Sequence, residues 1–278
     1  MFDFFYGSKE DIYENPEDFL VFVKHLLPRW VNGIPDSEFI AMYRIINNFS
    51  KAEKPQIAVE TGCGASSLIL FFNAVNTNGK LYSWDTNGSK LSYLRAVINE
   101  AICIPLEINV NEYWQTISFD STSEIAGISM LRDMGVSPNI GFFDSYHSWS
   151  HLKKEVSRFL AIQSDSDKLV MIDDAYYNAI FENYAYGNMI RRKVGLPPIS
   201  EPEVNRGATF QTRFEDEFSG DLYSIEVASS DLEKLVEDDL FFSYYSADRR
   251  SMNSMAMEDA SKLGSRLAAW TVTSLQKK

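Results

Sequence analysis

The stretch Glu60-Thr61-Gly62-Cys63-Gly64-Ala65-Ser66 places a carboxylate and two glycines between two apolar runs. This arrangement is typical of a buried strand, a tight turn and a helix. Glycine lets the backbone turn tightly and leaves room for a ligand, because it has no Cβ atom. The first N–H groups of the helix point into the same space. We therefore expect a ligand here, in contact with Gly62, Cys63, Gly64 and Ser66.

Two carboxylates near this turn limit the kind of ligand. Glu60 precedes the first glycine by two residues, where it would repel a pyrophosphate and attract a cation. S-adenosylmethionine carries a sulfonium, an ammonium and no phosphate, so Glu60 favours this cofactor over NAD. Alternatively, Glu60 only caps a neighbouring loop. Asp85 ends the run KLYSWD, where a carboxylate can accept both ribose hydroxyls. Because both cofactors contain that ribose, Asp85 indicates a nucleoside without choosing between them.

The remaining pattern predicts the α/β framework that holds this turn. Short apolar runs alternate with helical patterns, which is typical of a parallel sheet covered on both faces. We expect a Rossmann-like, mostly parallel, seven-stranded sheet with helices on both faces and a closing antiparallel hairpin. The predicted strands are 56–60, 81–85, 104–108, 139–143 and 168–173. The predicted helices are 65–76, 88–100, 121–135, 148–163 and 177–194.

An N-terminal addition precedes the sheet. Asn15 and Pro16 are typical of a helix start, and a second helix is expected to begin near Asp36. Residues 1–52 are therefore predicted to be a helical extension, which is a candidate lid over the site. The cofactor-binding domain is expected to follow at 53–230.

The C-terminal part contains a hairpin signal and a helical pattern. Two strands, 207–214 and 222–229, are predicted to form the hairpin that closes the sheet. Residues 231–278 form a predicted C-terminal extension, with a helix over 256–275. This helix either packs on its own domain or forms the seam of a homodimer.

Taken in order, these motifs resemble the class I S-adenosylmethionine-dependent methyltransferases. The resemblance rests on E-x-G-x-G-x-S at 60–66, the acid that ends strand two, and GFFDSYHSWSHLKKEV at 141–156. The serine in place of a third glycine is similar to the methyltransferase type 24 group, which is related to catechol O-methyltransferase-like enzymes and to cephalosporin hydroxylase. The resemblance covers residues 56–175 and implies methyl transfer from S-adenosylmethionine to a small molecule. Adenine contacts in that group follow strand three, where Asn109 and Asn111 match no clear pattern.

Three aspartates end the fourth and fifth predicted strands. With the family's topology these strands are neighbours, so Asp144, Asp173 and Asp174 would meet at one edge. A hard divalent cation would neutralise such a group of carboxylates. The resemblance implies the same, because catechol O-methyltransferase-like enzymes hold Mg²⁺ with acids at these places. In metal-free relatives, acids here contact the substrate or cap a helix, which is the alternative.

His147 lies three residues after Asp144, where the resemblance places the general-base lysine of the catechol group. Imidazole can take a proton near neutral pH. The implied mechanism uses the metal to lower the pKa of a substrate oxygen, and His147 to remove the proton before the oxygen attacks the methyl group. His147 and Asp144 are thus the predicted catalytic residues; alternatively, His147 caps a helix or packs. His151 lies one turn further, and zinc is not expected without a third nitrogen or sulfur ligand.

The aromatic residues around the site and the remaining alternatives stay open. Tyr113, Trp114, Tyr176 and Tyr177 either wall a substrate pocket or pack in the core. One alternative function is a cephalosporin-hydroxylase-like enzyme or ligand-binding protein on the same fold. A second is an NAD(P)-dependent oxidoreductase.

Composition limits the partners and the compartment. The 278-residue chain has a net charge of −13, which makes nucleic acid a poor partner. Its two cysteines, Cys63 and Cys103, form no disulfide framework and are expected in the core of a protein in a reducing cytoplasm. The N-terminus lacks the features of a signal peptide, and no apolar run reaches the roughly 20 residues that span a bilayer. We expect a cytoplasmic protein with a small-molecule substrate and no membrane partner.

Overall fold

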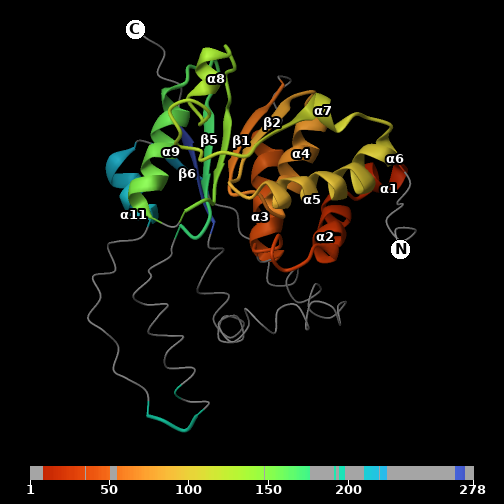
Figure 1. Cartoon of the computed structure of the whole chain (residues 1–278), viewed down its shortest axis with the longest axis horizontal. Coiled ribbons are helices and arrows are strands. Elements are labelled where there is room, and N and C mark those ends of the chain that lie inside the picture. The colour runs from red at the N-terminus through yellow and green to blue at the C-terminus, as the bar shows by residue number, and fades with distance from the viewer. Residues whose placement is uncertain are drawn as a thin grey trace.

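The computed structural model describes residues 9–34, 36–50, 55–146, 148–175, 191, 194–197, 210–218, 220–223 and 267–272. Seven strands in these residues form one sheet in the order β3-β2-β1-β4-β5-β7-β6 (Figure 1). The strands are β1 (Ile57–Thr61), β2 (Lys80–Trp84), β3 (Trp114–Ile117), β4 (Ile140–Phe143), β5 (Lys168–Ile172), β6 (Asp221–Tyr223) and β7 (Ala268–Val272). The first five in spatial order pair in parallel, and β7 is antiparallel to both β5 and β6. The predicted fold class is confirmed.

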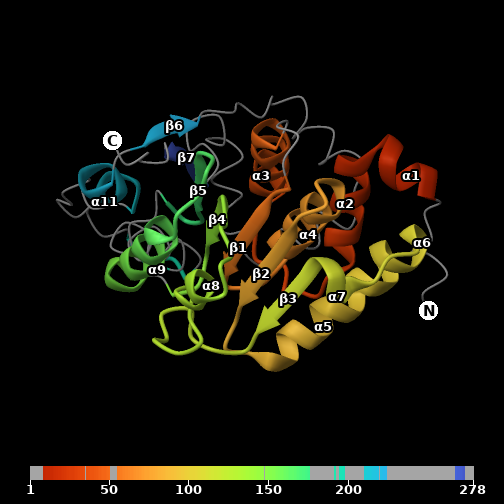
Figure 2. The same cartoon turned by 90° about the horizontal axis from the view of Figure 1, so that it is seen from above.

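One face of the sheet is covered by helices from the N-terminal half (Figure 2). They are α1 (Lys9–Glu14), α2 (Pro16–Leu26), α3 (Asp36–Phe49), α4 (Ser66–Asn76) and α5 (Gly88–Ile98). The helix α4 is buried over nine of its eleven residues, because the sheet covers one side and α2 and α3 cover another. The N-terminal helices are therefore part of this core, to which Leu20 and Phe39 contribute fully buried side chains.

The other face is covered by α8 (Met130–Asp133), α9 (Trp149–Ala161) and α11 (Phe210–Glu217). The helix α9 is amphipathic, and Leu152, Val156 and Phe159 bury its apolar side against the sheet. Phe214 of α11 stacks on Trp270 of β7 with ring centroids 4.1 Å apart. This second core fixes α9 beside the carboxyl end of β4, where the predicted catalytic segment begins.

The predicted third strand over 104–108 is wrong. After α5 the chain continues as a π-helix, η1 (Asn99–Cys103), and then as α6 (Ile104–Leu106). The helical stretch ends at Glu107, whose φ of 55° lies in the left-handed region. A short α7 (Val110–Tyr113) leads into β3 at 114–117. The apolar residues Ile104, Leu106 and Ile108 alternate as in a strand, but only Leu106 is buried, and so short a run does not distinguish a strand from a helix.

Four further predictions need correction or fall outside the described residues. Of the helix predicted over 121–135, only α8 is α-helical. Residues 210–217 form α11 instead of a strand, and the antiparallel pair that closes the sheet consists of 221–223 and 268–272. The helix predicted over 256–275 is a strand at 268–272, and residues 256–266 lie outside the described part. The helix predicted over 177–194 also lies almost entirely outside it.

Candidate functional site

The first residues after four neighbouring strands lie side by side along the carboxyl edge of the sheet. The backbone N–H of each donates to the last carbonyl group of an adjacent strand, with N···O distances of 3.2 Å for Asp85 to Ile117, 2.9 Å for Gly62 to Trp84, 2.9 Å for Asp144 to Thr61 and 3.2 Å for Asp173 to Phe143. The sheet register therefore fixes these residues in one row. The order reverses between β1 and β4, which is where ligands bind in sheets of this kind.

Other backbone segments approach both glycines of the turn closely, and at Gly62 they leave no room for a side chain. Gly62 has a φ of 78°, and a Cβ atom there would lie 1.8 Å from the carbonyl oxygen of Asp144. Gly64 lies beneath the loop between α2 and α3, where a Cβ atom would lie 3.1 Å from the carbonyl oxygen of Val31. The predicted strand–turn–helix is present, and part of the room that its glycines leave is filled by the protein's own backbone.

Glu60 is fully buried beneath the turn, within β1. Its Oε1 accepts hydrogen bonds from Ser66 Oγ at 2.7 Å and Ser67 Oγ at 2.9 Å, and its Oε2 accepts from Ser83 Oγ at 2.6 Å. Burial raises the pKa of Glu60, although the three hydroxyls and the charge of Lys90 act in the opposite direction. The contacts join β1 to α4 and β2. The predicted attraction of Glu60 for a cationic cofactor stays a prediction.

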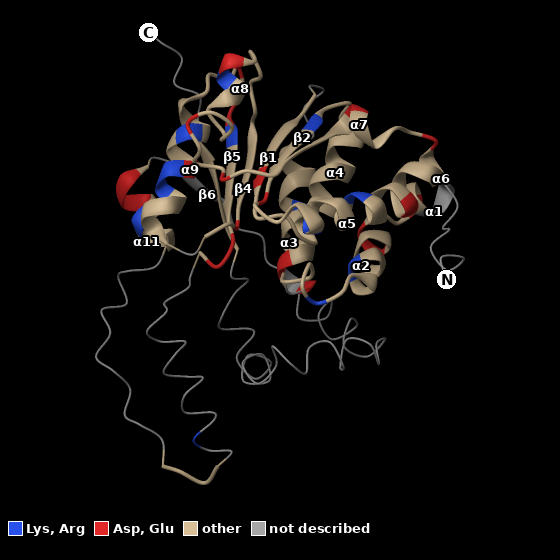
Figure 3. Cartoon of the chain, viewed as in Figure 1, with Lys and Arg blue, Asp and Glu red and all other residues tan. Residues whose placement is uncertain are grey.

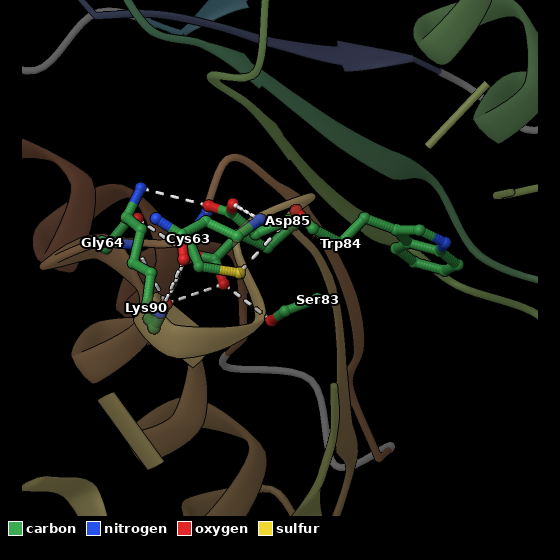
Figure 4. A network of polar contacts seen from close by, with 10 residues as sticks. Cys63, Gly64, Ser83, Trp84, Asp85 and Lys90 are labelled. Atoms are coloured by element: carbon green, nitrogen blue, oxygen red, sulfur yellow. Dashed lines mark hydrogen bonds and ion pairs between the residues drawn. The ribbon is translucent and has the colours of Figure 1, made fainter. Parts of the chain in front are cut away.

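Asp85 lies directly beside the turn (Figure 4), and its predicted contact with a ribose stays a prediction. Its Oδ2 accepts from the backbone N–H of Cys63 at 3.1 Å and lies 3.1 Å from Nζ of Lys90. Its Oδ1 accepts from the backbone N–H of Asn87 at 2.8 Å. Both carboxylate oxygens are thus engaged within the protein.

A cavity of about 170 Å³ lies between this turn and the loop that joins α2 to α3. Its lining consists of Arg29, Trp30, Val31, Gly33, Ile34, Cys63, Gly64, Ala65, Ser66, Lys90 and Asp144. Of the residues predicted to contact the cofactor, Cys63, Gly64 and Ser66 line the cavity, whereas Glu60, Gly62 and Asp85 do not. Trp30 reaches across to α5, where its ring centroid lies 5.3 Å from that of Tyr93. The N-terminal extension thus contributes one wall through its α2–α3 loop.

Several lining residues were not predicted from the sequence, among them Arg29, Val31 and Lys90. Lys90 could have been predicted from the sequence, because it is a cation in the first turn of a predicted helix, five residues after the aspartate that ends a strand. No local pattern marks Arg29 or Val31, since their place at the site depends on how α2 and α3 pack on α4.

The three aspartates predicted to bind a metal interact with one another but do not form a complete set of ligands. Burial, together with the charges of Asp173 and Asp174 and the side-chain interaction with Asp173, raises the pKa of Asp144 well above its usual range. Asp174 has a φ of 50°, which is uncommon outside glycine. An all-oxygen donor set suits a hard divalent cation. However, no three Asp, Glu, His or Cys side chains in the described residues are grouped closely enough to hold a metal ion. Metal binding stays a prediction.

The predicted base, His147, lies outside the described residues. His151 is described, and its Nε2 lies 3.3 Å from Oε1 of the buried Glu155 and 3.4 Å from Oγ of Ser121. Ser145 Oγ donates to the same Oε1 at 2.7 Å. The hydrogen bond to Glu155 raises the pKa of His151. This cluster joins α9 to the loops that follow β3 and β4.

The corrected position of β3 also moves the region expected to hold adenine. Asn109 caps α7 by accepting the backbone N–H of Asn111 at 3.0 Å, and both residues precede β3. The carboxyl end of β3 leads instead to Ser118, whose Oγ would lie 3.2 Å from a Cβ atom at Gly88. This loop is therefore next to the start of α5 and to Asp85.

Two of the four aromatic residues expected near the pocket pack in the core. Trp114 is 1% exposed and donates from Nε1 to Ser83 Oγ at 2.8 Å. Tyr113 packs against the first core. Tyr176 and Tyr177 lie outside the described residues.

The two cysteines are buried, as predicted. Burial raises the pKa of Cys63 well above its usual range and that of Cys103 to about 12. Both thiols are therefore neutral near pH 7 and are poor nucleophiles.

The described helices mix the two signs of charge. Figure 3 shows basic segments in blue beside acidic ones in red on α9 and α11. None of the described helices is both long enough and apolar enough to cross a membrane.

Comparisons with known proteins show the fold. No family profile matches the sequence, and no curated protein matches it. A candidate caffeoyl-CoA O-methyltransferase from Staphylococcus aureus matches over 95% of this chain and 96% of its own, at 11% identity and a TM-score of 0.50. An O-methyltransferase from Bacillus cereus in complex with SAH matches over 82% and 94%, at 12% identity and a TM-score of 0.44. The chain has the class I methyltransferase fold.

Substitution of Gly62 by alanine should be far more costly than the same change at Gly135. Both glycines have positive φ, but a Cβ atom at Gly135 would meet nothing within 4 Å. We expect Gly135→Ala to cost about 1 kcal/mol, and Gly62→Ala roughly 3 kcal/mol or more because of the clash with Asp144. Urea unfolding followed by circular dichroism measures both. Equal costs would show that β1 and β4 do not approach this closely.

Asp144→Asn should stabilise the protein in metal-free, chelator-containing buffer. The folded-state pKa of Asp144 is raised, so folding favours its protonated form. That contribution is present below the unfolded-state pKa and is lost as pH rises through the folded-state pKa. Asparagine does not titrate and avoids this loss. Above the folded-state pKa of Asp144, the variant should therefore have a free energy of unfolding about 1 kcal/mol higher than the wild type, and at acid pH the two should be equal.

The matched control is Asp133→Asn, because the Asp133 side chain is 71% exposed. Urea unfolding at several pH values measures both variants. An Asp144→Asn variant that is less stable than the wild type at neutral pH would contradict the expected repulsion among the aspartates.

Proposed function

We propose that the protein is an S-adenosylmethionine-dependent methyltransferase that acts on an oxygen atom of a small molecule. The observation that supports this most directly is the cavity at the switch point of the sheet, between the Gly62–Gly64 turn and the α2–α3 loop, with Asp85 bonded to the turn. The class I methyltransferase fold agrees with the proposal, but a fold alone does not define an activity.

The residues of the site match the parts of this cofactor. The turn Gly62–Gly64 offers backbone groups to its amino acid end, and the carboxylate of Asp85 suits the ribose hydroxyls. Asp144 and Arg29 both line the cavity and are of opposite charge, as the ammonium and carboxylate of the cofactor require. The loop after β3, beginning at Ser118, is next to Asp85 and is the proposed adenine region.

The bound cofactor would supply a methyl group activated by a positive sulfur. The task of the chain is then to hold the acceptor oxygen in line with that group, to exclude water and to remove the proton from the acceptor. The groups at hand are the aspartates at the ends of β4 and β5, with His147 as the proposed base. The position of Asp144 and Asp173 on the same sheet edge as the cavity supports the part given to the aspartates.

Metal assistance is the finer part of the proposal. Asp144, Asp173 and Asp174 would hold Mg²⁺, which would lower the pKa of the acceptor hydroxyl. The repulsion that raises the pKa of Asp144 supports a cation at this place. Asp173 and Asp174 would have to reorient, since the three side chains are not arranged as a ligand set.

Isothermal titration with S-adenosylhomocysteine tests the cofactor. We expect the wild type to bind it at micromolar concentration, and Asp85→Asn to bind roughly tenfold more weakly, because an amide accepts the ribose hydroxyls less well. Asp133→Asn is the control and should bind normally. NADH is the second ligand, because Arg29 and Lys90 place two cations at the cavity. Binding of NADH without S-adenosylhomocysteine would support the oxidoreductase alternative instead.

Methyl transfer from labelled S-adenosylmethionine to a panel of small hydroxylated compounds tests whether the activity depends on a metal ion. We expect activity to need Mg²⁺, to be lost with a chelator, and to fall at least roughly a hundredfold in Asp144→Ala and Asp173→Ala. Asp133→Ala should keep full activity. Transfer that is unaffected by the chelator would rule out metal assistance. Cofactor binding without transfer to any compound would favour the ligand-binding alternative.

A further inference from the structure

The cavity is too small for the nucleoside cofactor that the proposed function requires. Pockets for small molecules and cofactors usually measure roughly 300–1,000 Å³. The cavity above the turn measures about 170 Å³, and its walls include the side chain of Lys90 and the backbone of the α2–α3 loop. A nucleoside cofactor therefore needs at least one of these walls to move.

Lys90 is the wall that also occupies the expected ribose contact. Its Nζ lies 3.1 Å from Oδ2 of Asp85, and the two side chains are 21% and 11% exposed (Figure 4). The other oxygen of Asp85 accepts the backbone N–H of Asn87. A ribose diol needs two acceptor positions on this carboxylate, so it cannot bind fully while the ammonium remains.

The position of Lys90 in α5 is unusual. Its backbone N–H donates to the side chain of the capping residue Asn87 at 3.2 Å, which places Lys90 in the first turn of the helix. A cation is disfavoured there by the helix dipole, and α5 has no acidic residue in that turn. The lysine backbone is fixed by the cap, whereas its four-carbon side chain can swing away without moving the helix.

We propose that Lys90 is a displaceable partner of Asp85 that competes with the ligand's ribose diol and so lowers the affinity for the nucleoside cofactor. This inference rests on the proposed function, because it takes a vicinal diol as the group that binds Asp85. Only the fraction of molecules in which Lys90 has left Asp85 can accept the diol, and the apparent affinity falls by that fraction. The lysine thus determines affinity without contacting the reacting atoms.

Titration calorimetry with S-adenosylhomocysteine tests this on the full chain. We expect Lys90→Met to bind roughly twofold to fivefold more tightly than the wild type, which is the range for a partly exposed ion pair. Lys90→Arg keeps a cation at the site and should show no gain. Lys153→Met is the control for charge, since Lys153 pairs with Glu217 on the outer side of α9, at 50% exposure. It should leave the affinity unchanged.

The diol requirement is tested with adenosine and 2′,3′-dideoxyadenosine. The gain from Lys90→Met should appear with adenosine and be absent with the dideoxy compound, which has no hydroxyls to offer Asp85. Unchanged or weaker binding of S-adenosylhomocysteine by Lys90→Met would overturn the inference, and weaker binding would mean that Lys90 contacts the ligand. If neither the wild type nor Lys90→Met binds S-adenosylhomocysteine or adenosine, the proposed function fails as well. If only Lys90→Met binds them, both proposals are supported.

Discussion

The backbone of Gly62 lies so close to the carbonyl group of Asp144 that no side chain fits between the ends of β1 and β4. The site depends on this approach. Because residue 62 is a glycine, the chain can leave β1 at a φ of 78° and bend back toward β2. The next backbone N–H group, that of Cys63, then reaches Asp85. The close approach also keeps Asp144 at the cavity instead of pushing the end of β4 away. A residue with a Cβ atom would separate the two strands at the point where the sheet order reverses.

Glu60 illustrates the difference between proximity in sequence and proximity in space. It precedes the turn by two residues, yet its carboxylate faces three serine hydroxyls in the core and not the cavity. In this low-dielectric setting the hydroxyls compensate the charge, and the network joins two strands and a helix beneath the turn. The charges that a ligand meets directly are those of Arg29, Lys90 and Asp144. Glu60 therefore acts on the proposed cofactor only through the turn that its hydrogen bonds support.

The sequence was informative where local signals end an element. Glycines or aspartates follow the predicted β1, β2, β4 and β5, and these strands were found to within one or two residues. The run 104–108 after α5 was misassigned because its apolar residues alternate as in a strand, and so short a run does not distinguish a strand from a helix. The strand β7 was missed for another reason. Its partners, β5 and β6, are distant in sequence, and the spacing of Leu267 and Trp270 suits a helix as well. The placement of Arg29 and Val31 at the site depends on tertiary packing alone.

Asp144 lies both at the cavity and in the group of aspartates at the ends of β4 and β5, so it links these two parts of the site. It lines the cavity, and its carboxyl group interacts with those of Asp173 and Asp174, which raise its pKa. Three carboxylates along one edge cannot all be charged at low cost, so a proton, a metal ion or a cationic ligand group must compensate them. A cation that binds to Asp144 from the cavity changes the net charge of the aspartate group, and a cation bound by the aspartates changes the charge at the cavity. In the proposed function, cofactor binding and acceptor binding would therefore be thermodynamically coupled through this residue, and the coupling would be reciprocal. A chain that separated the two functions would need a neutral residue after β4, where this one has an aspartate.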